Sequence, residues 1–134
     1  MSGENVEVVE AAYQAFAEHG IDGFLNYLTE DVDHRAIEGA LDDRGPMHGK
    51  DDVRAYVQDW HDTFDEFTAQ PLELIDAGQS QVVAVIRFAG RAKLSGVETE
   101  GTFGVLYTIR DGRIFKGREY STREEALEAA GLRE

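Results

Sequence analysis

Cysteine is absent from this sequence, proline occurs only twice and tryptophan only once. Without cysteine the chain has no disulfide framework, no thiolate metal ligand and no cysteine nucleophile. The first residues contain no basic segment followed by an apolar one, and no window reaches the ~18 consecutive apolar residues of a membrane span. From these absences we expect a cytoplasmic protein.

Basic residues are also scarce: 13 lysines and arginines stand against 27 aspartates and glutamates, which gives a formal net charge of −14. So acidic a surface repels phosphate groups, and we therefore expect neither a nucleic acid nor a membrane as a partner. The 134 residues are 42% hydrophobic and 30% charged, which is typical of one globular domain spanning residues 1–134.

The first half of the chain carries apolar residues at helical spacing. The spacing predicts a helix that ends at Gly20, a short second helix capped by Asp22, and a third helix over residues 50–67. Between the second and third helices, residues 32–38 are predicted to form a strand and residues 39–49 a loop. The apolar residues of the first and third helices are Val6, Val9, Tyr13 and Phe16, then Val53, Tyr56, Val57, Trp60 and Phe64.

The second half is rich in β-branched and aromatic residues, which predicts strands over residues 72–76, 81–94, 98–109 and 114–120. Asp111 and Gly112 predict a hairpin turn, and Thr122 with Glu125 predicts the capped start of a short last helix. Helices followed by antiparallel strands indicate an α+β fold. We expect three helices to pack on a strongly curved sheet of four or five strands, forming a cone with one open mouth.

Three segments resemble the SnoaL-like family of the NTF2-like superfamily. They are residues 30–35 (EDVDHR), residues 110–114 (RDGRI) and residues 118–132, which contain REY and EALEAAGL. The resemblance implies an NTF2-like α+β cone, commonly dimeric, with a pocket between the helices and the concave face of the sheet. Members include polyketide cyclases, ketosteroid isomerases, limonene-epoxide hydrolases and proteins without enzymatic activity, so the fold leaves the function open.

Glu119 is the first catalytic candidate. The sequence Arg118-Glu119-Tyr120 is similar to the Arg-Asp-Tyr of limonene-epoxide hydrolases, in which the aspartate is the catalytic base. Strand alternation would then place Phe115, Gly117 and Glu119 on the pocket face. The alternative is a carboxylate at the rim that pairs with an arginine of the neighbouring strand.

Arg87 is the second catalytic candidate, because it interrupts the apolar run over residues 82–88, where a charge is costly without a partner. The resemblance to the hydrolases implies an Arg-x-Asp pattern here, but Ala89 replaces the aspartate, which argues against an Asp-Arg-Asp hydrolase mechanism. Arg87 would instead bind a carbonyl or carboxylate together with Glu119. The alternative is a structural ion pair across adjacent strands.

His34 is the third catalytic candidate. An imidazole inside the cone would act as a general acid, a general base or a hydrogen-bond anchor near neutral pH. The alternative is a histidine that hydrogen-bonds to a helix terminus. The candidate ligand-binding residues are Tyr13, Tyr56, Trp60 and Phe115. For the three on helices, as for Tyr107 on a strand, ordinary core packing is the alternative.

No cofactor site is predicted. The four histidines have no metal-ligand spacing, and the sequence contains neither a glycine-rich phosphate loop nor a Gly-x-Ser-x-Gly elbow.

A homodimer is expected from the apolar residues of the strand that contains Arg87. If Arg87 faces the pocket, the apolar row Val82, Ala84, Ile86 and Phe88 covers the convex face of the sheet, where only a second subunit would bury it.

Three functions fit these observations. The first is a cofactor-independent isomerase, cyclase or hydrolase that acts on an apolar, carbonyl-bearing metabolite, with Glu119 as base and Arg87 or His34 as its partner. The second is a ligand-binding module without catalysis. The third is a dimeric scaffold whose cone is filled by its own aromatic side chains.

Overall fold

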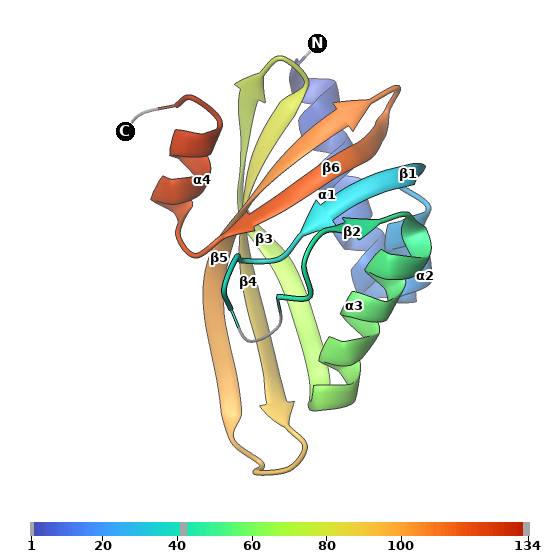
Figure 1. Ribbon diagram of the computed structural model, residues 1–134, viewed down its shortest axis with the longest axis vertical. Helices are drawn as coiled ribbons and strands as arrows, with labels where there is room; N and C mark the ends of the chain where they lie inside the picture. The colour runs from blue at the N-terminus through green and yellow to red at the C-terminus, as the bar shows by residue number, and fades with distance from the viewer. Residues whose placement is uncertain (1, 41–42, 133–134) are drawn as a thin grey trace.

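The computed structural model describes residues 2–40 and 43–132, and this part of the chain forms four helices and one six-stranded sheet (Figure 1). The strand order is β2-β1-β6-β5-β4-β3, and all neighbours are antiparallel except β1 and β6. The elements are α1 (Ser2–His19), α2 (Ile21–Leu25), β1 (Leu28–Arg35), β2 (Met47–His48), α3 (Lys50–Thr63), β3 (Phe64–Gly78), β4 (Gln81–Ala92), β5 (Glu98–Arg110), β6 (Arg113–Tyr120) and α4 (Arg123–Ala129). The α+β class with a curved sheet and covering helices is confirmed.

Several predicted boundaries shift. The second helix follows Gly20 directly and is not capped by Asp22, and the first strand begins at Leu28 and ends at Arg35. The third helix ends at Thr63 rather than at residue 67, because Phe64 is extended and pairs with Ala92 of β4. Strand pairing along β3 therefore overrides the helical spacing at residues 64–67.

Helices cover both faces of the sheet (Figure 1). The main core, made by α1, α2, α3 and the inner face, contains Val82, Ala84 and Ile86 of β4. On the outer face, α4 packs through Ala126 and Leu127 against Val83. The expectation that Val82, Ala84, Ile86 and Phe88 lie on the convex face is therefore wrong. The run from Val82 to Val85 is buried on both faces at this end of the sheet, so its sequence carries no alternation that reveals the inner face.

A β-bulge in β6 changes which residues face inward. Ile109 pairs with Ile114 and Thr108 pairs with Lys116, so Phe115 is an extra residue on β6. Ile114 is consequently buried in the core, while the guanidinium carbon of Arg110 lies 3.9 Å from the centre of the Phe115 ring. Beyond the bulge the predicted alternation holds, with Gly117 and Glu119 buried and Lys116 and Arg118 exposed.

None of the helices in the described ranges is long and apolar enough to cross a membrane.

Candidate functional site

A cavity of about 220 Å³ lies between the helices and the inner face of the sheet. Aromatic and aliphatic side chains form most of its wall. The aromatic residues without a polar group on the ring are Phe16, Phe24, Phe67, Phe88 and Phe103. Trp60 of α3 also lines the cavity and stacks on Phe64 and Phe67, at ring-centre distances of 5.5 and 5.4 Å.

Glu119 places a carboxylate in this apolar wall, with its side chain only 10% exposed. Its Oε2 lies 2.7 Å from Nε2 of His34 on β1. The hydroxyl of Tyr56 on α3 donates to both oxygens, at 3.0 and 3.1 Å. A carboxylate accepts hydrogen bonds and cannot donate them, so an ionised Glu119 requires the proton of the imidazole on Nε2. The carboxylate is thus held by groups from two other elements.

Gly117 makes room for the rings that surround Glu119. It pairs with His34 of β1 on one side and with Tyr107 of β5 on the other. A Cβ atom at this position would lie 2.6 Å from Nδ1 of His34 and 2.9 Å from Cε1 of Tyr107. Both rings therefore rest on a stretch of backbone that carries no side chain.

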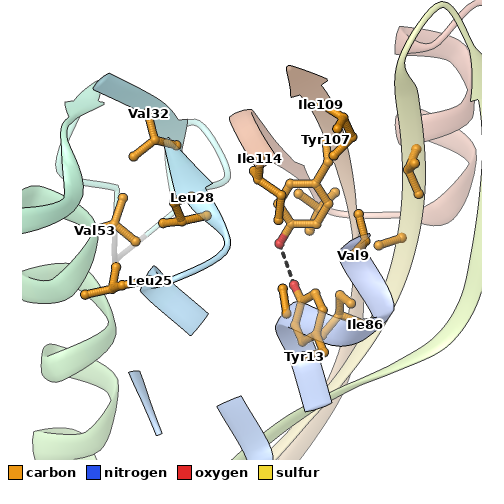
Figure 2. Close-up of a cluster of buried hydrophobic side chains, with 14 residues drawn as sticks. Val9, Tyr13, Leu25, Leu28, Val32, Val53, Ile86, Tyr107, Ile109 and Ile114 are labelled. Carbon is orange, nitrogen blue, oxygen red and sulfur yellow. Dashed lines mark hydrogen bonds between the residues drawn. The ribbon is translucent and has the colours of Figure 1, made fainter. Parts of the chain in front are cut away.

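Two buried tyrosines form a second polar group in the cavity wall. The hydroxyls of Tyr13 on α1 and Tyr107 on β5 are 2.5 Å apart, and Figure 2 shows them pointing at each other between apolar side chains. Burial raises the pKa of both phenols above the usual tyrosine range, and the nearby Glu119 charge raises them further. Both hydroxyls stay protonated at neutral pH. One of their two protons makes the bond between them, which leaves the other for a further acceptor.

The structure brings together most of the residues singled out from the sequence. The same cavity is lined by Tyr13, His34, Tyr56, Trp60 and Glu119. From the sequence, Gly117 was expected only to lie on the inner face. A glycine inside a strand often marks a place where another group approaches the backbone closely, and this signal could have indicated its role. Tyr107 becomes part of the site through its bond to Tyr13.

Two predicted site residues lie elsewhere. Arg87 is on the outer face of β4, where its Nη2 lies 2.7 Å from Oε1 of Glu100 on β5. This contact confirms the structural ion pair and places the guanidinium outside the cavity wall. Phe115 does not line the cavity either, because the bulge turns it toward Arg110. Within the described ranges, no group of three or more His, Cys, Asp or Glu side chains is placed to hold a metal ion.

The family model of the SnoaL-like domain matches residues 9–116. The chain belongs to the SnoaL-like family, as the sequence motifs predicted. The match begins at Val9 within α1 and ends at Lys116 within β6, before Glu119.

Solved structures share this fold at low sequence identity. An NTF2-like protein of unknown function from Burkholderia pseudomallei is 23% identical, with a TM-score of 0.76 over 93% of this chain and 95% of the other. TerC, co-crystallised with polyporic acid, is 21% identical, with a TM-score of 0.75 over 96% and 98%. A candidate SnoaL-like polyketide cyclase from Jannaschia sp. CCS1 is 16% identical, with a TM-score of 0.74 over 88% and 85%. No protein of curated function matches the sequence.

Proposed function

We propose that this protein is a cofactor-independent enzyme that moves a proton on a small, apolar, carbonyl-bearing substrate. The observation that carries the proposal is Glu119, a carboxylate nine-tenths buried in an apolar cavity and held in place by His34 and Tyr56. A carboxylate removed from water and fixed in orientation is suited to act as a general base.

In the proposed reaction, Glu119 removes a proton from the carbon next to the carbonyl. The C–H bond breaks, its electron pair forms the C=C bond of an enolate, and the carbonyl oxygen becomes negative. The tyrosine pair supports this step, because one hydroxyl proton of Tyr13 and Tyr107 is left to donate to the oxygen. When the substrate carries a C=C bond between its β and γ carbons, return of the proton from Glu119 to the γ carbon moves that double bond into conjugation with the carbonyl and completes an isomerisation.

His34 and Tyr56 act as positioning residues in this proposal. Each bonds to the carboxylate and so limits its rotation, which favours attack from one direction. A hydrolase mechanism that needs a cation beside the base has no support, because Arg87 is engaged with Glu100 on the outer face. We therefore propose an isomerase or cyclase and not a hydrolase.

The test measures proton exchange at the carbon next to a carbonyl group. Small ketones such as cyclohexanone are incubated with the protein in D2O and followed by NMR, and 3-cyclohexenone is followed by the absorbance of its conjugated isomer. We expect exchange above the buffer rate, and a loss of about 10²–10⁴-fold in Glu119→Gln. Glu128→Gln, an exposed carboxylate on α4, is the matched control.

A Glu119→Gln protein that binds the ketone and exchanges it at the wild-type rate would exclude Glu119 as the base. Binding without exchange in either protein would favour the second function, a ligand-binding module. We also propose a cytoplasmic location and a homodimer, both of which were expected from the sequence.

A further inference from the structure

We infer that the cavity also binds small organic ammonium ions, and that it prefers them to neutral and anionic molecules of the same shape. The first observation is the charge of its wall. Among the described residues that line the cavity, none is lysine or arginine, and Glu119 is the one carboxylate. An anion would therefore meet a negative group without a compensating cation, whereas an ammonium ion would meet its counter-charge.

Two arginines of the sheet, Arg118 of β6 and Arg87 of β4, pair with carboxylates and do not line the cavity. Arg118 precedes it on β6 but is half-exposed, with its Nη2 3.7 Å from Oε1 of Glu38. Arg87 pairs with Glu100 on the outer face. Tyr56 and His34 are the hydrogen-bond partners of the carboxylate in the cavity wall, and neither is a lysine or an arginine. A buried carboxylate without a lysine or arginine beside it favours a positively charged ligand, because such a ligand neutralises its charge.

The apolar part of the wall suits a cation as well. Trp60, Phe67 and Phe88 line the cavity together, and the faces of aromatic rings attract alkylated ammonium groups. The methyl groups of such an ion are also apolar and fit a wall that offers few hydrogen-bond partners. The formal net charge of −14 raises the local concentration of cations around the whole molecule.

The cavity volume limits the size of the ion. About 220 Å³ is below the roughly 300–1,000 Å³ of pockets for drug-sized ligands. A trimethylammonium group on a short chain is the class that combines small size, positive charge and an apolar surface. The inference needs the cavity and the charge of Glu119 but no proton transfer, so it goes beyond the proposed function and stands or falls separately from it.

The test compares three probes of similar shape by calorimetry at low ionic strength. The probes are choline, its uncharged analogue 3,3-dimethylbutan-1-ol, in which carbon replaces nitrogen, and the anion 3,3-dimethylbutanoate. The measurement is made at pH 8.5, where a histidine side chain in water is neutral. We expect choline to bind the wild-type protein about tenfold more tightly than the alcohol, and the carboxylate to give no measurable binding.

Variants connect the preference to the site. In Glu119→Gln the advantage of choline over the alcohol should vanish, while in Glu128→Gln, which removes one exposed negative charge from α4, it should persist. Equal binding of choline and the alcohol to the wild-type protein, a preference that survives Glu119→Gln, or no binding of any probe would each overturn the inference. Because the wild-type comparison needs no variant, a misfolded Glu119→Gln protein leaves the test decisive.

Nuclear Overhauser contacts show where choline binds on the wild-type protein, without the use of variants. Methyl protons of bound choline should contact ring protons of Trp60 or Tyr56. Contacts confined to the acidic surface of α4 would show that the ion is held outside the cavity and would overturn the inference too.

Discussion

At the scale of single residues, the geometry of the site depends on a position that has no side chain. Gly117 stands between His34 and Tyr107, and each ring approaches its Cα more closely than a Cβ would allow. His34 contacts Glu119, and Tyr107 contacts Tyr13, so one glycine sets the position of both polar groups in the cavity.

We predict that Gly117→Ala separates His34 from Glu119. The new methyl group would lie 2.6 Å from Nδ1 of His34, so the imidazole must move, at a cost of about 1–3 kcal/mol in the free energy of unfolding. Urea denaturation measures the stability, and the ¹⁵N chemical shifts of the His34 ring report the lost contact with Glu119.

Gly90→Ala is the matched control for this substitution. It adds a Cβ to another strand glycine, 2.9 Å from Cβ of Phe64 and outside the cavity wall. It should lower the stability by a similar amount and leave the His34 shifts unchanged. If both variants left His34 undisturbed, Gly117 would have no positioning role.

At the scale of elements, the sequence predicts which helices, strands and turns form better than it predicts which face of a strand points into the core. The hairpin at Asp111 and Gly112 forms as expected, because both residues adopt positive φ angles of 53° and 77°. The faces of β4 were assigned wrongly, because its apolar run is buried under helices on both sides. Phe115 was misplaced because a bulge is decided by pairing between strands, which no local pattern encodes.

The residues of the site could be predicted only in part, because the sequence does not show which face of a strand points into the cavity. Glu119 was predicted from the resemblance of its motif, His34 from its place on a strand of the cone, and Tyr56 from its place on an apolar helix stripe. The structure joins the three through hydrogen bonds. Arg87 was predicted because it interrupts an apolar run, and its side chain lies on the opposite face of the sheet. A charge within an apolar run signals that it has a partner, but the partner's location depends on the tertiary structure.

The last helix offers a prediction at this scale. Thr122 caps α4 by accepting a hydrogen bond from the backbone N–H of Glu125 at 3.1 Å, as the sequence predicted. Because α4 has seven residues, one cap is a large part of its stability. Thr122→Ala should lower the free energy of unfolding by about 1 kcal/mol, measured by urea denaturation.

Ser121→Ala provides the comparison, because Ser121 is equally exposed and precedes the capping position. Its stability should match that of the wild-type protein within about 0.5 kcal/mol. Equal losses in the two variants would mean that the hydrogen bond to Glu125 contributes nothing specific.

At the scale of the whole molecule, the covering of the sheet decides what surface is left for a second subunit. Of the apolar row that suggested a dimer, Val82, Ala84 and Ile86 are buried in the inner core, and Phe88 lines the cavity. On the outer face, α4 covers Val83 and Leu106, and beyond it the sheet presents the Arg87–Glu100 pair. A homodimer on this face would therefore join surfaces that carry charges, not the bare apolar patch that the sequence had suggested.

We predict that such a homodimer is sensitive to salt. Contacts through exposed charges weaken as ions screen them, whereas apolar contacts do not. Sedimentation equilibrium at micromolar concentration should give a dimer at low ionic strength and a larger monomer fraction in 1 M salt. Arg87→Gln should shift the low-salt equilibrium toward monomer, while Lys93→Gln, beyond the end of β4, should not. A monomer under all conditions would exclude the dimer, and a dimer indifferent to both salt and Arg87 would place the interface on a different, apolar surface.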